Sequence, residues 1–235
     1  MIHGELEIPA GPRGILSELL SVVLDFIPAE RIVLGGGTAL AARWQHRESL
    51  DVDLFVDPVI FDANIYHHAA ECEDRLARLG FGRLATLDEH GCHISHRAGN
   101  VDIVGCFPLT PDSRSRDFVA GTGIALETNR EILAKRLHRQ ILGHGQIVPR
   151  DLYDFAFARR FEPESMQAAW KAQRVVDADS LVAALGSFAP GWMDRQEETV
   201  LGARYPELEA HAVKGMLDDV LGRFPSLSPD RRRQH

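Results

Sequence analysis

Apolar residues recur at helical or strand spacing through most of the first 127 positions. Between Ile15 and Ile27 they recur every three or four residues, which indicates a packing helix that Pro28 ends. Short apolar runs bounded by turn residues follow, and such runs are typical of strands. We therefore expect helices at 15–27, 38–45 and 64–79, and strands at 31–34, 51–56, 81–87, 92–97, 101–106 and 124–127.

The pattern changes near residue 127, because every later periodic segment has helical spacing. A run of strands followed by a run of helices is typical of α/β (α+β) proteins or of two separate domains. The sequence predicts an α/β core with a mixed sheet at residues 1–128 and a helical C-terminal domain at residues 129–235. The helices expected in that second part are 131–142, 150–160, 163–174, 180–188 and 205–224.

A glycine cluster and a pair of aspartates interrupt the apolar pattern of the first half. Gly35, Gly36 and Gly37 follow a short strand and open an alanine-rich helix, where backbone N–H groups can approach a phosphate. Asp51 and Asp53 lie two residues apart in the next strand, so they face the same side. Two carboxylates on one face repel each other. A divalent cation that prefers oxygen ligands, such as Mg²⁺, removes that cost, and the combination indicates phosphoryl or nucleotidyl transfer.

The stretch from Leu34 to Asp57 resembles the DNA polymerase β-type nucleotidyltransferase superfamily, whose motif is a Gly-Gly or Gly-Ser turn, a short helix and Asp-x-Asp on a strand. Within it, GGTALA followed by R-x-S-x-D-x-D is most similar to the AbiEii nucleotidyltransferase toxins of type IV toxin–antitoxin systems. EILAKRL from Glu131 and RDLYD from Arg150 are similar to that family's lysine helix and R-D-x-x-D segment. The resemblance implies the nucleotidyltransferase fold, an NTP substrate and Mg²⁺.

We expect Asp51, Asp53 and Asp102 to be the catalytic carboxylates and to hold the metal. The roles of Asp51 and Asp53 are inferred from their shared strand face. The alternative interpretation is that these two carboxylates only bond to nearby backbone or to Arg47. Asp102 is inferred because a lone acid interrupts the apolar strand Val101–Val104, where a buried acid is costly without a cation or another partner. Its alternative is a solvent-facing acid on an edge strand.

The predicted nucleotide-binding residues of the first half lie around the same motif. Gly36, Gly37 and Thr38 would form the phosphate cradle, or the glycines only a strand-to-helix turn. Ser49 lies two residues before the first aspartate, so its hydroxyl could bond a phosphate oxygen or a metal-bound water, or only a local group. Arg47 would share that face as a clamp or as an ion-pair partner of the aspartates.

The resemblance also implies two site residues in the helical half. Lys135 would grip the phosphates of the nucleotide, since a lysine is a compact point charge suited to that role. Its alternative is an i,i+4 pair with Glu131, and the adjacent Arg136 leaves open which cation faces the site. Asp151 is placed by the resemblance at the catalytic centre, and its alternative is a helix N-terminal acid favoured by the helix dipole.

The net charge of −8 argues against broad nonspecific nucleic-acid binding. Residues 129–160 nevertheless carry seven Lys/Arg against three acids, a patch that suits a triphosphate, one RNA strand or a solvated helix face. The chain has three cysteines, an odd number that suits free thiols in a reducing compartment. It has no apolar run near the roughly 20 residues of a membrane helix, and its N-terminus has no signal-peptide pattern. These features predict a cytoplasmic protein with no membrane segment.

Histidines and a cysteine cluster between His90 and His96, which raises a structural zinc site as an alternative use of that segment. Strand alternation would send His93 to the face opposite Cys92 and His96, so the pattern favours a histidine-rich hairpin.

The predicted function is therefore Mg²⁺-dependent transfer of an NMP from an NTP to a macromolecular acceptor. The resemblance favours a tRNA 3′ end, which would make the protein a toxin with a cognate antitoxin. The alternatives are transfer onto a protein side chain, and a non-catalytic nucleotide-binding module.

Overall fold

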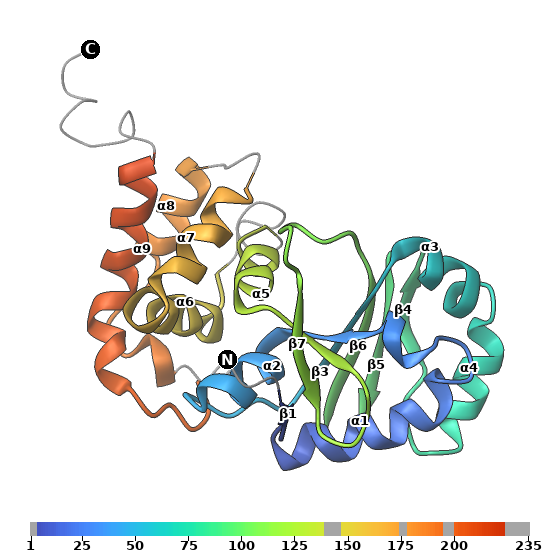
Figure 1. The fold of residues 1–235 in the computed structure, drawn as a ribbon. Coiled ribbons are helices and arrows are strands. Elements are labelled where there is room, and N and C mark those ends of the chain that lie inside the picture. Colours follow the sequence, from blue (N-terminus) through green and yellow to red (C-terminus); the bar gives the residue numbers. More distant parts are fainter. Residues whose placement is uncertain (1–3, 139–146, 174–177, 195–199, 224–235) are drawn as a thin grey trace. The chain divides into compact units, whose positions relative to one another are not determined.

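The computed structural model describes residues 4–138, 147–173, 178–194 and 200–223. The chain divides into two units, Met1–Thr128 and Asn129–His235. Every strand among the described residues belongs to the first unit, and the described elements of the second unit are all helical (Figure 1). The described residues therefore show the mixed α/β class that the sequence predicts.

The first unit is built on one mixed sheet, which has eight strands among the described residues. Their order is β1-β7-β8-β2-β3-β6-β5-β4. The strands are β1 (Glu5–Leu6), β2 (Val33–Leu34), β3 (Val52–Val56), β4 (Leu84–Asp88), β5 (Gly91–His96), β6 (Gly99–Gly105), β7 (Arg114–Val119) and β8 (Ala125–Glu127). At the centre, β3 pairs antiparallel with β2 and parallel with β6.

The central strands bury one face and leave the other part-exposed. Val52, Leu54 and Val56 of β3 are buried, whereas Asp53 and Phe55 between them are half-buried. The helix α1 (Ala10–Val23) packs against β3, β6 and α4 (Ala69–Ala77), so the buried face forms the core of this unit. The alternation of apolar and polar residues along β3 thus decides which side chains remain accessible.

Helices of the first unit differ from the sequence expectation at their ends. α1 begins at Ala10, five residues earlier than expected, because Pro12 lies in the first turn, where a missing N–H breaks no helical bond. The expected helix at 64–79 is replaced by α3 (Pro58–Phe61), the π-helical turn η2 (Asp62–Tyr66) and α4. Asp57 caps α3 by accepting a hydrogen bond from the Val59 N–H at 2.9 Å.

The second unit is helical throughout its described part. α5 packs against α7, while α6 packs against α7 and α9. The helices described there are α5 (Asn129–Arg136), α6 (Pro149–Phe161), α7 (Pro163–Lys171), α8 (Ala178–Gly186) and α9 (Glu209–Arg223), with short 3₁₀ turns at Trp192–Asp194 and Pro206–Leu208; a further 3₁₀ turn, Ala29–Arg31, lies in the first unit. The expected extension of the 131–142 helix beyond residue 138 lies outside the described residues.

Cys72 and Cys92 are buried in the first unit, and Cys106 is half-buried. Burial raises the pKa of the Cys72 thiol to about 11 and that of the Cys92 thiol to about 12. Both therefore remain protonated at neutral pH and pack as small apolar groups. In the described ranges, we find no helix with the length and hydrophobicity that crossing a membrane requires.

Candidate active site

Two aspartates lie side by side on the part-exposed face of the sheet. Asp53 of β3 pairs in register with Asp102 of the parallel strand β6. In-register partners on neighbouring strands point to the same face, and the side chain of Asp102 is 28% exposed. β6 is an interior strand, so Asp102 is not the edge-strand acid of the alternative interpretation. Its catalytic role stays a prediction.

The glycine turn after β2 lies directly against Asp53. The Gly35 N–H donates to the Asp53 carbonyl at 2.9 Å, and α2 (Gly36–Trp44) begins at the next residue. Gly36 has a φ of +60°, which favours glycine. A Cβ on Gly36 would lie 1.8 Å from Oδ2 of Asp53. The carboxylate therefore occupies space that only a glycine leaves open at the N-terminus of α2.

Thr38 and Ser49 connect α2 to the residues before β3. Thr38 is fully buried, and its hydroxyl lies 3.0 Å from the Ser49 Oγ and 2.5 Å from the Asp51 carbonyl oxygen. A hydroxyl buried in these contacts positions the backbone of Asp51. Thr38 thus supports the glycine turn, and the predicted phosphate contacts of Thr38 and of the half-buried Ser49 stay predictions.

Asp51 and Arg47 lie at the entry to β3. The Asn100 backbone N–H and its side-chain amide donate to Oδ1 of Asp51 at 3.1 and 3.3 Å. Asp51 is thus oriented toward the start of β6. Arg47 is buried, and its Nη1 donates to the Glu48 carbonyl at 2.8 Å. The predicted role of each in binding stays a proposal.

His93 extends the row of polar side chains beyond Asp102. It pairs in register with Asp102 across β5 and β6, and its Nδ1 lies 2.8 Å from Oδ1 of Asp102. Cys92 is buried on the opposite face, as strand alternation requires. His96 shares that opposite face, where its ring lies 4.7 Å from the Phe81 ring. The histidines of this hairpin thus point to two different faces.

Glu127 is a site neighbour that the sequence analysis did not single out. It ends β8 and is only 2% exposed. A Cβ on Gly35 would lie 2.1 Å from its Oε2, so its carboxylate lies over the glycine turn on the far side from Asp102. The signal was present, since a lone acid ends the apolar run Ile124–Leu126, just as Asp102 interrupts an apolar strand. His93 carried no such signal, because its partner depends on strand register.

The donor set of this row fits Mg²⁺ by its chemistry, since carboxylate oxygens are the hard ligands that the ion prefers. Within the described ranges, no group of three acid, histidine or cysteine side chains is arranged to hold a metal ion. Protein-bound Mg²⁺ commonly takes one or two carboxylates and completes its shell with water and substrate phosphates. Asp53 and Asp102 are accordingly the pair that would hold it, and the metal-binding role of Asp51, whose Oδ1 accepts from Asn100, stays a prediction.

In the second unit, the residues implied by the resemblance belong to one ion pair and one three-residue ion cluster. The Lys135 Nζ lies 3.5 Å from Oε1 of Glu131, whose side chain is fully buried. Nη1 of Arg136 donates to a carboxylate oxygen of Asp151 and, at 2.5 Å, to Oδ2 of Asp154. Both aspartates are almost fully buried. Asp151 therefore lies inside an ion-pair cluster within the helical unit, and its predicted catalytic role is not tested by this geometry.

Comparisons with known proteins place these observations in a family. The family model described as "Nucleotidyl transferase AbiEii toxin, Type IV TA system" matches residues 18–190, well over half of the chain. No curated protein sequence matches. A crystal structure of a candidate nucleotidyltransferase from Helicobacter pylori is 15% identical, with a TM-score of 0.50, and covers 92% of this chain and 96% of that one. The structure of JHP933 from H. pylori is 14% identical, with a TM-score of 0.49, and covers 92% and 94%. The likeness to the nucleotidyltransferase structure with the TM-score of 0.50 shows a shared fold.

Proposed function

The chain belongs to the AbiEii nucleotidyltransferase toxin family of type IV toxin–antitoxin systems, and from that premise we propose that it moves an NMP from an NTP to a macromolecular acceptor. The family match identifies a nucleotidyltransferase. The observation that carries the finer proposal is the in-register pair of Asp53 and Asp102 beside the glycine turn at the N-terminus of α2. That arrangement offers oxygen ligands for a cation and backbone N–H groups for a phosphate within one local structure.

We assign the roles by contact. Asp53 and Asp102 would hold Mg²⁺, which when bound neutralises phosphate charge and activates an attacking hydroxyl. The N–H groups of Gly36 and Gly37 would bind the triphosphate at the helix N-terminus. His93 would hold Asp102 in its orientation through the 2.8 Å contact, and Ser49 would contact a phosphate oxygen or a bound water. Lys135 keeps the phosphate-binding role that the family resemblance implies.

The acceptor that the family favours is the 3′ end of a tRNA, and the family description makes a cognate antitoxin the expected protein partner. A protein side chain is the alternative acceptor, because the carboxylate row by itself does not select one hydroxyl over another. Free thiols at all three cysteines and the nucleotide substrate support a cytoplasmic location. The remaining alternative is a non-catalytic nucleotide-binding module, and activity measurements distinguish it from an enzyme.

The test is incubation with each of four labelled NTPs and Mg²⁺, with total RNA and total protein offered in separate reactions. We expect label in RNA, none when EDTA replaces Mg²⁺, and a loss of about a hundredfold or more in Asp53→Asn. Asp74→Asn is the matched control, because Asp74 is an exposed acid of α4. Label in protein alone would select the other acceptor. If the folded protein incorporates no label from any NTP, the hypothesis of a non-catalytic nucleotide-binding module is favoured over the enzyme.

A further inference from the structure

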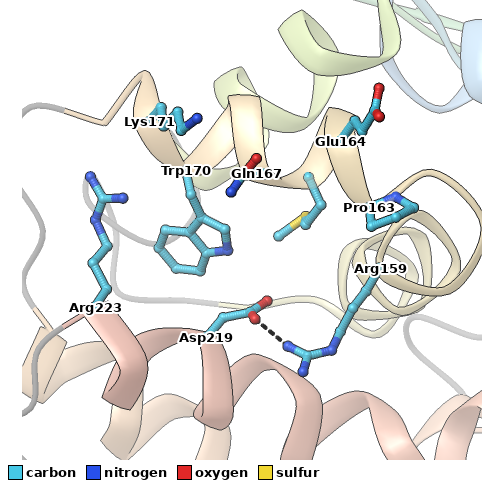
Figure 2. A pocket seen from close by; sticks show the side chains of 9 residues that line it. Arg159, Pro163, Glu164, Gln167, Trp170, Lys171, Asp219 and Arg223 are labelled. Atoms are coloured by element: carbon cyan, nitrogen blue, oxygen red, sulfur yellow. Dashed lines mark hydrogen bonds and ion pairs between the residues drawn. The ribbon is translucent and has the colours of Figure 1, made fainter.

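The helical unit contains a pocket that none of the proposed catalytic residues lines. It has a volume of about 600 Å³, within the range of small-molecule binding sites. α6, α7 and α9 supply its walls (Figure 2). The lining residues are Arg159, Pro163, Glu164, Met166, Gln167, Trp170, Lys171, Asp219 and Arg223.

One end of the pocket is cationic. Lys171, the last residue of α7, and Arg223, the last residue of α9, lie at the same end in Figure 2. Both side chains are exposed, and neither has an ion-pair partner in the described part of the chain. Arg159 differs, because its Nη1 is bound to the Gly215 carbonyl and to Asp219. Two cations that pair with no acid of the described residues therefore face whatever enters at this end, and lysine and arginine are side chains that bind phosphate.

The wall of the pocket holds a buried donor that needs an acceptor. Trp170 is only 7% exposed, and its Nε1 has no hydrogen-bond partner among the described residues. Figure 2 shows its indole ring extending from α7 toward α9. An indole N–H can only donate, and a buried donor without an acceptor costs stability. A ligand that offers an acceptor at this point would satisfy it, and Gln167 beside it can both donate and accept.

The far end of the pocket has the opposite polarity. Glu164 lies in the first turn of α7, seven residues or about 10 Å of helix before Lys171. Figure 2 shows Glu164 and Pro163 at the end away from the two cations. A carboxylate there accepts from an amino or hydroxyl group, and Met166 and Trp170 add apolar surface to the lining.

We propose that this pocket binds a nucleoside monophosphate at a site separate from the proposed catalytic row. Lys171 and Arg223 together balance the charge of about −2 that a phosphate monoester carries at neutral pH. The apolar surfaces of Met166 and Trp170 accommodate a sugar and base, Trp170 and Gln167 bond polar atoms of the base, and Glu164 accepts from its amino group or a ribose hydroxyl. A simple carboxylate would leave one cation and the buried indole N–H unused.

The test is titration calorimetry on the full chain in EDTA, with AMP, GMP, CMP and UMP, the matching nucleosides, and inorganic phosphate. We expect saturable binding of at least one monophosphate. The matching nucleoside and inorganic phosphate should each bind more weakly than that monophosphate. Lys171→Gln and Arg223→Gln should each weaken binding by about tenfold or more. Trp170→Phe keeps an aromatic ring but loses the N–H donor and part of the indole surface, so it should weaken binding by roughly two- to tenfold.

Arg160→Gln is the matched control, because Arg160 pairs with Glu207 at 3.2 Å and does not line the pocket. The proposal fails if no monophosphate binds at millimolar concentration, if the nucleoside or phosphate alone binds equally well, or if the pocket variants bind like the control. Lys171 and Arg223 are exposed, so their variants should fold normally. Repeating the titration in Asp53→Asn separates this site from the catalytic row: pocket binding should persist there whether or not the chain transfers nucleotides.

Discussion

Gly36→Ala should remove nucleotidyl transfer by displacing Asp53. The backbone at Gly36 has a φ of +60°, and an alanine Cβ there would lie 1.8 Å from Oδ2 of Asp53. Real Cβ atoms do not come within 3.0 Å of another heavy atom, so the carboxylate must move by more than 1 Å. Asp53 then loses its position beside Asp102, although every catalytic side chain is still present.

Two effects of different size follow from this one methyl group. A left-handed backbone costs an L-residue about 1–2 kcal/mol of stability. A displacement of about 1 Å in a group that orients the reaction can cost about a hundredfold in rate. The stability loss alone leaves most of the protein folded, since natural domains are stable by about 5–15 kcal/mol. Activity should therefore fall much more than the folded fraction.

Gly123→Ala is the matched control for backbone strain. Gly123 has a φ of +71°, and a Cβ there would meet nothing within 4 Å. Both variants should lose similar stability in a denaturant titration, while labelled-NTP incorporation should fall about a hundredfold in Gly36→Ala only. If Gly36→Ala is as active as Gly123→Ala, the contact between the glycine turn and Asp53 has no catalytic importance and the reasoning is refuted.

The other predictions concern the helical unit and the thiols. Lys135→Ala should weaken binding of a nonhydrolysable NTP by roughly ten- to a hundredfold, and Lys135→Arg should restore part of that affinity. Titration calorimetry measures the affinity, with Lys214→Ala, at an exposed lysine, as the control. An unchanged affinity would make Lys135 a purely structural partner of Glu131. Arg136→Met should destabilise the chain by about 3–5 kcal/mol in urea, because it leaves two buried carboxylates without their cation; a loss below about 1 kcal/mol would contradict the buried pairing. With a thiol reagent at pH 8, the two buried cysteines should react only on unfolding, because their raised pKa values leave almost no thiolate; fast labelling of all three thiols would contradict their burial.

The pH dependence of those buried thiols has a definite sign. Each has a folded-state pKa above the ordinary value of 9.0, so the unfolded chain loses its thiol protons first as pH rises. Their contribution to stability is therefore complete below about pH 9 and is lost between about pH 9 and 12. Alkaline unfolding should begin in that window.

The part of the site that the sequence predicts is the part made by local spacing. The two-residue interval between Asp51 and Asp53 predicts a common face; β3 begins at Val52, after Asp51, and its alternation leaves Asp53 and Phe55 half-buried between buried residues. The position of the glycines between a strand and a helix predicts a turn, and α2 begins at Gly36. These features depend only on residues close in sequence, so no knowledge of pairing is needed.

What the sequence does not predict depends on strand pairing and on distant partners. β7 carries alternating exposed and half-buried residues, including Arg116 and Asp117, so it has no apolar signal and was not predicted. The contact of His93 with Asp102 requires the register of β5 on β6. The basic patch at 129–160 was counted by charge alone. In the structure, four of its members, Lys135, Arg136, Arg159 and Arg160, pair with acids of the same unit.

That pairing changes which groups are left to bind a triphosphate. Cations held by buried or neighbouring carboxylates contribute less net attraction to an incoming anion than their number suggests. The carboxylate row on the sheet repels the same anion. A triphosphate can bind this row only if a cation neutralises it, while the backbone N–H groups of the glycine turn contribute without any counter-charge. The glycine turn and the carboxylates proposed to bind metal would therefore act together, which is why a methyl group on Gly36, touching Asp53, should disable both at once.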